Sequence, residues 1–511
     1  MNSTWKSLLW KEWREQRWRL VAIAAISSFI ALCYPIVLIN TKMNISAIRE
    51  WINWQSVWLI NYIVLTGTFL GMAVAGGEAS RRTMSFLQAL PNPLWHAASA
   101  KILLAVTTGA IPILIIQLLS FFLLAWRVGN IEDLNSALVQ ISSTNSDPFR
   151  SPYHWFVSAT ISSILGVSSI LIWMLAGGMN RADEVRAGAE GFLVCIALWL
   201  MFTLSMGLAV KYELSLSFLL YFLIPALPGG PGIIFQLSSN SSQSLPLSSL
   251  VLIGLISHGA IVAWYLKEFG RVAVRPKRSV NTTSQFSFWR SARKRRFPSQ
   301  WHAIAWKQCR ETGPLAVASA GAILSIAPLA YYFSGGDSSE ELGLILAGVS
   351  SSVGFFVLIV TGIGLYIEDF APSLNYFWRS RPIRVVEWFT VKLVTGITLL
   401  AACFGLIFLL AYTLASVVFP HGNFSAWLFV AQVLLLIYTL SMASYCLLRQ
   451  PIYAAVLAIG LFVGGTIIFT LLFGGDKYFW MTIFTLFLVQ IVVLAISYLA
   501  VKHDLGWKVG R

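Results

Sequence analysis

The sequence predicts an all-α membrane protein with about twelve transmembrane helices, and three observations support this fold class. The residues are 57% hydrophobic and 11% charged, whereas soluble domains carry about 25% charged residues. The mean hydropathy is +0.74. Apolar runs of roughly 20 residues, the length that crosses the hydrocarbon core as a helix, recur along the whole chain. These observations exclude an ordinary soluble enzyme or binding domain.

The predicted spans form two sets of six. The first set comprises residues 20–39, 54–76, 97–126, 153–177, 191–210 and 248–266, and the second comprises residues 314–333, 343–367, 388–419, 425–448, 452–473 and 479–501. Because six is even, each set starts and ends on the same side of the membrane, so the two sets are parallel repeats. We expect a first six-span half at residues 1–270, a basic cytoplasmic linker at 271–299, and a second half at 300–511.

The distribution of Lys and Arg predicts the orientation. With the N-terminus inside, the outer loops hold six of the 36 basic residues, namely Lys42, Arg49, Arg127, Arg150, Lys211 and Lys477. This asymmetry follows the positive-inside rule, so we expect both termini on the cytoplasmic side of the cytoplasmic membrane. The net charge of +15 then reflects inner loops near membrane lipids. Nucleic acid is not expected as a partner, because it would need one basic patch on a soluble face.

Each half opens on a tryptophan-rich segment, TWKSLLWKEWREQRW in the first and QWHAIAWKQCRETG in the second. The segments align at an offset of 296 through Trp5 and Trp301, Trp10 and Trp306, Lys11 and Lys307, Arg14 and Arg310, and Glu15 and Glu311. Trp5, Leu9 and Trp13 share one helical face, although Lys6 and Glu12 interrupt it. We predict an interfacial helix in each half, anchored by Trp5, Trp10, Trp13, Trp301 and Trp306. The alternative is a positively charged anchor without this role.

A second repeated segment lies between the second and third spans of each half. It reads GEASRRTMSFLQALPNPLWHAASAK in the first half and IEDFAPSLNYFWRSRPIRVVEWFTVK in the second. Glu78 aligns with Glu368 at an offset of 290, and at 291 Pro91 aligns with Pro382 and Lys101 with Lys392. On a helix, Arg81, Ser85 and Gln88 fall on one face and Met84, Leu87 and Leu90 on another. The polar face can meet a soluble partner; an ordinary membrane-surface helix is the alternative.

Motifs that would carry chemistry are absent from the sequence. There is no GxxxxGK[ST], HExxH or GxSxG sequence, and the six histidines lack ligand spacing. We therefore expect no enzyme activity and no cofactor or metal in this chain. No Asp or Glu falls in the core of a predicted span, although ion-driven carriers usually need ionisable groups there. The energy source is therefore expected in a cytoplasmic partner.

A few polar or small residues inside the predicted spans stand out. His258 lies deep in the sixth span and is a possible pathway residue, or it forms a hydrogen bond to a neighbouring helix. Gln117 and Gln490 are expected to form interhelical hydrogen bonds, and Gly67 and Gly71 to allow close helix packing. Lys101 and Lys392 enter their spans about one to three turns from the cytoplasmic end, so their ammonium groups can extend to the lipid headgroups.

The outer side of the first half contains one unusual stretch. Residues Leu214 to Leu227 are apolar but too short to span, so we predict a helix that dips into the membrane and returns. Long outer loops are expected at 127–152 and 228–247, with a turn on the outer side at Gly229-Gly230-Pro231-Gly232.

Taken together, these segments resemble the membrane subunits of type-2 ABC exporters. In that family an amphipathic helix precedes the first span, a Glu ends the second span, and a coupling helix, a Leu-Pro pair and a Lys follow. The matching positions are Trp5 to Arg19, Glu78, Arg82 to Leu90, Leu90-Pro91 and Lys101, then Glu368, Ser373 to Arg381, Pro382 and Lys392. The second copy departs from the pattern with Arg381-Pro382 and Pro372. We therefore expect the first copy to couple more strongly to the partner.

The resemblance implies an exporter permease with both membrane halves in one chain and a hydrophobic or amphipathic substrate. A separate ABC ATPase dimer would bind on the cytoplasmic side and supply ATP and Mg²⁺ chemistry. The coupling candidates are Glu78, Arg81, Arg82, Ser85, Gln88, Pro91, Glu368, Asp369, Asn375, Arg379 and Pro382. The alternatives are an ion-gradient-driven carrier, a membrane enzyme that modifies lipid or transfers sugar, and a non-transporting sensor or assembly factor that binds an ABC ATPase.

Overall fold

The computed structural model describes residues 3–37, 45–80, 87, 94–128, 152–179, 184–211, 222–240, 247–269, 299–333, 354–355, 357–367, 369–370, 383–414, 424–473 and 479–505. Within these ranges every regular element is a helix, and no strand occurs in them. The predicted all-α class is therefore confirmed for this part of the chain.

Residue contacts divide the chain into two compact units. The first comprises Met1–Phe269, Tyr332–Ser334 and Ile459–Thr482, and the second comprises Gly270–Tyr331, Gly335–Ala458 and Ile483–Arg511.

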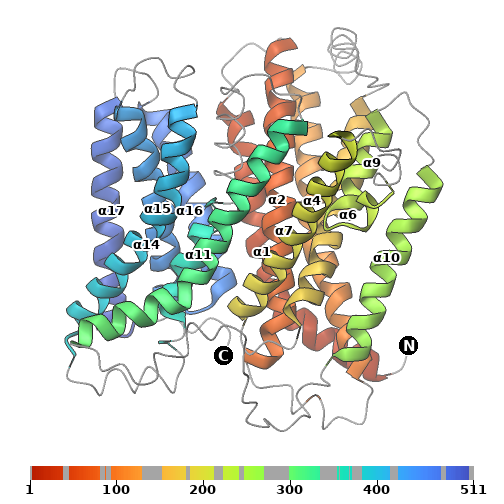
Figure 1. Cartoon of the computed structure of the whole chain (residues 1–511). Helices are drawn as coiled ribbons and strands as arrows, with labels where there is room; N and C mark the ends of the chain where they lie inside the picture. The colour runs from red at the N-terminus through yellow and green to blue at the C-terminus, as the bar shows by residue number, and fades with distance from the viewer. Residues whose placement is uncertain are drawn as a thin grey trace. The chain divides into compact units, whose positions relative to one another are not determined.

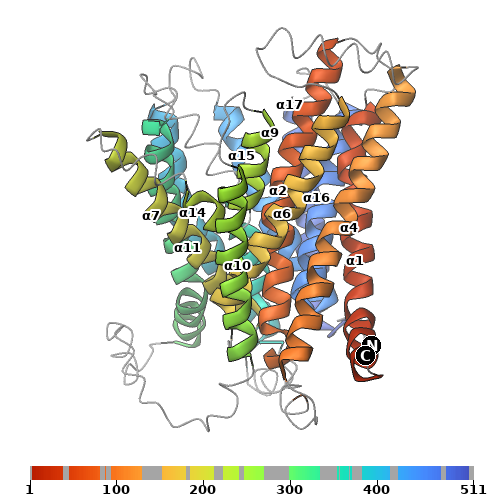
Figure 2. The same ribbon diagram turned by 90° about the vertical axis from the view of Figure 1, so that its right-hand side faces the viewer.

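The first unit is a bundle of long helices that also contains a short 3-10 turn and a shorter helix. Its helices are α1 (Ser3–Val37), α2 (Ile45–Ser80), α4 (Leu94–Val128), α6 (Pro152–Gly178), α7 (Glu184–Lys211), the 3-10 turn η2 (Ile224–Ala226), α9 (Gly230–Asn240) and α10 (Leu247–Glu268). The helix α2 packs against α6 and α7, α1 packs along α4, and α9 lies on α6. Figures 1 and 2 show the long helices running side by side, with α9 beside α6 and α10.

The second unit contains most of the remaining helices. They are α11 (Gln300–Phe333), a helix at Val357–Ile367, α14 (Val385–Leu414), α15 (Phe424–Leu448), α16 (Pro451–Phe473), whose later part belongs to the first unit, and α17 (Phe479–Lys502). Figure 1 draws α11 with a marked bend. The pair Gly313-Pro314 lies inside this helix, and a proline that interrupts the hydrogen-bond ladder is the usual cause of such a kink.

Seven helices in the described ranges are long and apolar enough to cross a membrane. They are Trp58–Gly76, Leu94–Trp126, Trp155–Gly178, Ser248–Glu268, Val385–Ile407, Ala431–Leu448 and Ile483–Lys502. Each coincides with one of the predicted spans. The chain is therefore a helical membrane-embedded protein, while the other predicted spans stay a prediction.

Several contacts inside the helix bundles match their sequence predictions. A Cβ atom added to Gly71 would lie 2.4 Å from Cβ of Met174, so α2 and α6 approach closely where the small residues lie, as predicted. The amide of Gln55 donates to Gln117 at 3.3 Å. These contacts confirm the expected close packing and one of the interhelical glutamine bonds. The second, from Gln432 to Gln490, joins α15 and α17.

Candidate functional site

Most of the predicted coupling residues lie outside the described part of the chain. Those outside it are Arg81, Arg82, Ser85, Gln88, Pro91, Glu368, Asn375, Arg379 and Pro382. Glu78 belongs to the last turn of α2, and its side chain is not described. Asp369 is the one coupling candidate whose side chain is described, and Leu87 is a described residue of the first coupling segment; both are buried. Each belongs to a cluster near the beginning of α4 or of α14.

Leu87 lies in an apolar cluster at the beginning of α4. Its side chain is 2% exposed and packs with Leu8 of α1 and Ala97 of α4. The prediction that Leu87 belongs to the apolar face of its segment is thus confirmed. The ring of Trp5 also meets the ring of His96 edge-on, with 5.6 Å between centroids. The start of α1, Leu87 and the start of α4 therefore form one packed corner.

A buried ion pair lies one turn further along both helices. Nζ of Lys101 is 2.9 Å from Oε1 and 3.1 Å from Oε2 of Glu12. Lys101 is 5% exposed and Glu12 is 2% exposed, while the partly exposed Lys11 lies 3.6 Å from the same carboxylate. Charged groups in an apolar interior are stable only when they are paired. The pair therefore holds α1 against α4 at this point.

The contact between α1 and α4 continues with neutral polar groups. Oγ1 of Thr108 lies 3.4 Å from Oε1 of Gln16 and 2.7 Å from the carbonyl oxygen of Leu104. Leu8, Glu12 and Gln16 are spaced by four residues and so occupy one face of α1. Glu12, which interrupts the predicted interfacial face, is thus the residue that pairs with α4.

Three of the five tryptophans of the predicted interfacial helices are exposed, whereas Trp5 and Trp306 are half-buried. Trp10 is 62% exposed, and Trp13 and Trp301 are exposed as well. Trp306 lies beneath the guanidinium of Arg310, which is 4.9 Å from the ring centroid. Exposed rings beside basic side chains are typical of a helix at the membrane surface. Their position relative to a membrane stays a prediction.

The second unit contains a comparable lysine cluster. Lys392 of α14 is 1% exposed, and its Nζ donates to the carbonyl oxygen of Leu365 at 2.7 Å and pairs with the carboxylate of Asp369. The ring centroids of Tyr366 and Trp388 lie 5.4 Å and 5.3 Å from the same nitrogen. Aromatic faces attract a desolvated cation. The carboxylate, the carbonyl group and the two rings together stabilise the buried ammonium.

Asp369 connects this lysine to α11. Nζ of Lys307, which belongs to α11, lies 2.6 Å from Oδ1 of Asp369 and 3.4 Å from Glu311. Burial alone would raise the pKa of Asp369, but the neighbouring Lys392 and Lys307 outweigh it and hold the pKa of this carboxyl below its ordinary value. Asp369 is therefore a carboxylate at neutral pH and joins α11 to α14.

The prediction that both lysines extend to the lipid headgroups is wrong. Lys101 and Lys392 are buried and paired with carboxylates inside the protein. The sequence reasoning missed Glu12 as a partner because it treated the acid as an interruption of a surface helix. Its four-residue spacing from Leu8 and Gln16 is the signal that identifies a buried face.

A non-helical turn lies among α6, α7 and α10 in the first unit. Residues 222–229 form the turn that contains η2, and α9 follows from Gly230. The predicted outer loop at 228–247 is therefore wrong for Gly230–Asn240, which are helical. Of the predicted re-entrant helix at Leu214 to Leu227, only residues 222–227 are described, and they form the turn and not an α-helix.

The glycines allow this turn to pack closely. Gly229 has a φ of 78°, in the left-handed region that favours glycine. A Cβ atom on Gly230 would lie 1.7 Å from the carbonyl oxygen of Ile224, and one on Gly232 would lie 2.4 Å from that of Ser162. The glycine run therefore packs against α6, with Gly229 in a turn as predicted, while the side of the membrane on which it lies stays a prediction.

Side chains of α6 and α7 satisfy the backbone of the turn. Three successive carbonyl groups accept hydrogen bonds: Ala226 from Trp173 Nε1 at 3.0 Å, Leu227 from Ser169 Oγ at 3.2 Å, and Pro228 from Trp199 Nε1 at 2.9 Å. The N–H of Gly229 donates to Ser169 Oγ at 2.9 Å. Ser169 lies roughly 13 Å from the end of α6 at 1.5 Å per residue. Irregular backbone at such depth is tolerated only when other protein groups satisfy it.

His258 of α10 belongs to the same hydrogen-bond network. Its Nδ1 lies 2.9 Å from the carbonyl oxygen of Gly254, and its Nε2 lies 2.6 Å from Ser169 Oγ. Because a carbonyl oxygen only accepts, Nδ1 carries a proton. The single hydroxyl proton of Ser169 is then shared between His258 and Leu227. The predicted interhelical hydrogen bond of His258 is confirmed, and a pathway role stays a prediction.

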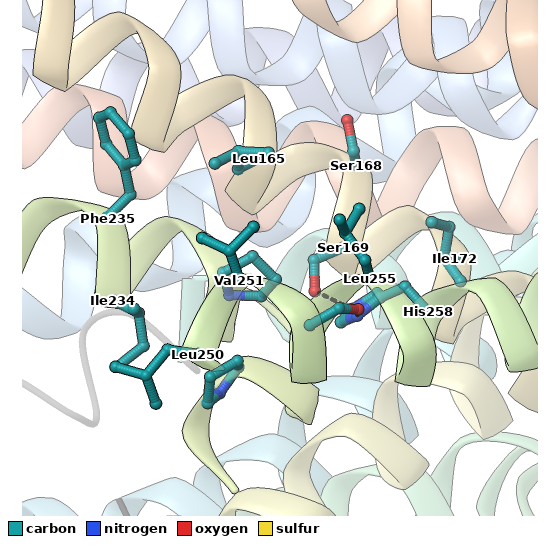
Figure 3. Close-up of a pocket in the computed structure, with 13 residues that line it drawn as sticks. Leu165, Ser168, Ser169, Ile172, Ile234, Phe235, Leu250, Val251, Leu255 and His258 are labelled. Atoms are coloured by element: carbon teal, nitrogen blue, oxygen red, sulfur yellow. Dashed lines mark hydrogen bonds between the residues drawn. The ribbon is translucent and has the colours of Figure 1, made fainter. Parts of the chain in front are cut away.

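A cavity of about 220 Å³ opens beside His258. Its walls come from α6, α9, α10 and the turn, and most of them are apolar. Figure 3 shows Ser169 and His258 facing each other at one side, while the hydroxyl of Ser168 points away. Val251 and Leu255 line the cavity and are largely exposed on α10.

A larger cavity of about 430 Å³ lies on the other side of the turn. Side chains of α2, α6 and α7 line it together with Gly229, Gly232 and Ile233. Its polar side chains are serines and the tryptophans Trp155 and Trp199, and no charged side chain lines it. Both cavities therefore suit uncharged apolar groups.

Comparison of this chain with protein-family models, with curated proteins and with solved structures finds no match.

Proposed function

We propose that this chain is the permease subunit of an ABC exporter, with two six-span halves in one chain and a separate cytoplasmic ATPase dimer. The observation that carries the proposal is the position of the two lysine clusters. Each joins the helix that bears the predicted interfacial segment to the helix after the predicted coupling segment, through Glu12 and Lys101 or through Lys307, Asp369 and Lys392. A displacement of either coupling segment by the ATPase would then move the two connected helices together.

The distribution of charge supports an apolar or amphipathic substrate. The two cavities of the first unit are lined without charged side chains. The buried ion pairs lie near the N-terminal ends of α4 and α14, away from the middle of these helices. An ion-gradient-driven carrier would need a titrating group along its pathway, and among the residues that line the two cavities His258 is the one such side chain. A substrate that partitions into the membrane needs no such group.

The proposal is tested by co-purification of this chain with a candidate ABC ATPase that has no membrane spans of its own. The variant Arg81→Glu with Arg82→Glu reverses two charges of the first predicted coupling segment. The variant Arg379→Glu with Arg381→Glu makes the matched change in the second segment. We expect the first variant to lose ATPase binding and stimulation, and the second to lose less.

The outcomes separate the proposal from its rivals. Unchanged binding and stimulation in both variants would overturn the coupling assignment. Substrate movement in vesicles that follows an ion gradient without the ATPase would support a carrier. ATPase binding without movement of any apolar dye or lipid would support a sensor or assembly factor.

A further inference from the structure

The two buried lysines occupy matching positions of the sequence repeat but pair with carboxylates from different places. Lys101 and Lys392 align at an offset of 291. Lys101 pairs with Glu12 of the first helix in its unit, whereas Lys392 pairs with Asp369, which follows the helix Val357–Ile367. Both buried lysines therefore pair with a carboxylate, but the carboxylate comes from a different segment in each unit.

The repeat positions show a reciprocal exchange of residue types. At the offset of 296, Glu12 corresponds to Gln308, which is fully buried on α11. At the offset of 290, which aligns Glu78 with Glu368, Asp369 corresponds to Ala79, near the end of α2. In this alignment the half with an acid at one position has a neutral residue at the other.

The local surroundings of Gln308 fit this exchange. Its Oε1 is buried with no hydrogen-bond partner among the residues that the structure describes, and its Nε2 reaches Thr312 at 3.4 Å. Thr312 corresponds to Gln16, which contacts Thr108 of α4 in the first unit. The face of α11 that bears Gln308 thus matches the face of α1 that bears Glu12.

We infer that each buried lysine is an electrostatic anchor for the interfacial helix of its half, and that its counter-charge can be placed at either of the two exchanged positions. In the first unit Glu12 makes the connection directly. In the second unit Asp369 makes it by accepting from Lys307 of α11 and Lys392 of α14 at once. These residues are positioning residues, because they act by holding helices together.

The physical reason is the difference between removing and moving a charge. Removal of one member of a buried pair leaves the other charge desolvated, whereas a carboxylate supplied from a neighbouring position restores the pair. In the first unit a carboxylate at position 79 would have Lys11 available as well, because Lys11 corresponds to Lys307. The link between the anchor and ATP-driven movement rests on the proposed function, whereas the test below uses the purified chain alone.

The test measures distances between spin labels in nanodiscs, on a background without the native cysteines. Cysteines at the exposed positions Arg14 and Leu103 report on α1 and α4. Cysteines at Arg310 and Val394, the corresponding exposed positions, report on α11 and α14. Wild type should show one narrow distance distribution for each pair.

The single variants Glu12→Gln and Asp369→Asn should widen the distribution in their own unit. The double variants Glu12→Gln with Ala79→Asp, and Asp369→Asn with Gln308→Glu, should return it to the wild-type width. Where a single variant is not recovered as a monodisperse protein, recovery of that peak by its double variant is the equivalent result. Glu387→Gln is the matched control, because it removes a carboxylate of α14 that forms no ion pair with Lys392 among the described residues.

Rescue in both units supports the inference. A single variant that stays as narrow as wild type overturns the anchor role of its lysine. A double variant that stays as wide as its single parent overturns the exchange of positions. These distances do not depend on an ATPase, so a failed co-purification leaves them interpretable.

Discussion

The lysine clusters at the ends of α4 and α14 and the turn between α6 and α10 satisfy buried polar groups in opposite ways. The clusters use full charges: Lys101 with Glu12, and Lys392 with Asp369. The turn uses neutral donors, chiefly Ser169 and the indole N–H groups of α6 and α7. Charges are concentrated near helix ends, and neutral hydrogen bonds serve the helix middle.

The difference shows where this protein tolerates a strong interaction and where it tolerates only weak ones. Loss of one charge partner leaves an ion in a low-dielectric interior, so the free energy of unfolding falls strongly. Loss of one neutral donor leaves a carbonyl group without its hydrogen bond, so the free energy of unfolding falls moderately. A single substitution in a lysine cluster is therefore expected to destabilise the protein strongly, whereas a single lost donor in the turn should have a smaller effect.

The largest effect is expected for Asp369→Asn. It leaves Lys392 buried without its carboxylate, and breaking a buried pair in this way lowers the free energy of unfolding by about 3–5 kcal/mol. Denaturant unfolding of the purified chain in detergent measures it. The double variant Asp369→Asn with Lys392→Met should recover much of the loss, because no buried charge remains.

The same pair predicts a dependence on pH. Because the pKa of Asp369 lies below its ordinary value, its contribution to stability is fully present above the ordinary pKa of an aspartate. It is lost as the pH falls through the lowered value in the folded state. Asp369→Asn should lack this acid-dependent part; an identical acid profile in both proteins would contradict the ionised pair.

The next largest effect is expected for Gly230→Ala in the turn. The added Cβ atom would lie 1.7 Å from a backbone oxygen, which cannot move aside as a side-chain end can, so we expect a loss of about 3 kcal/mol in unfolding free energy. Gly259→Ala on α10 is the control, because no atom lies within 4 Å of its added Cβ. Equal stability of the two variants would contradict the close packing of the turn.

A smaller effect is expected for Ser169→Ala. The change removes the hydroxyl shared by His258, Leu227 and the N–H of Gly229, and one such buried loss corresponds to about 2 kcal/mol. Ser168→Ala is the neighbouring control, because among the described residues its hydroxyl bonds only to Ile164 of its own helix. Thermal unfolding of both variants measures the difference, and a Ser168 effect as large as that of Ser169 would contradict the assignment.

The smallest effect is expected for Asp504→Asn, which tests whether burial makes the difference. Asp504 pairs with Arg449, but its side chain is 49% exposed. Exposed ion pairs contribute about 0–1 kcal/mol, so stability should fall far less than for Asp369→Asn. Similar losses for the two aspartates would show that burial does not set the strength of these pairs.

The sequence predicted the parts of the fold that depend on residue type and spacing within one segment. Long apolar runs identified helices, Gly67 and Gly71 identified a close contact, and Gln117 identified an interhelical bond. Each depends on a rule that holds whichever helix is the neighbour, because a buried amide needs a partner and a small residue permits approach.

The residues that were missed depend on which helices are neighbours. Glu12 interrupts an apolar face, and only its contact with α4 identifies it as the partner of Lys101. The stretch from Gly230 to Asn240 contains Gly, Pro, Ser and Asn residues that locally favour a loop. Its packing on α6 overrides that preference. Arg81 and Arg82 remain coupling candidates on sequence grounds alone.

The turn at residues 222–229 has a consequence for the order in which the helices assemble during synthesis. Trp173 and Trp199, which donate to its carbonyl groups, precede it in the chain, whereas His258 follows it. The turn can therefore enter the bilayer with most of its donors already in place. Of the described residues that bond to this network, His258 of α10 is synthesised last. Insertion of α10 is therefore expected to complete the hydrogen bonds of the turn.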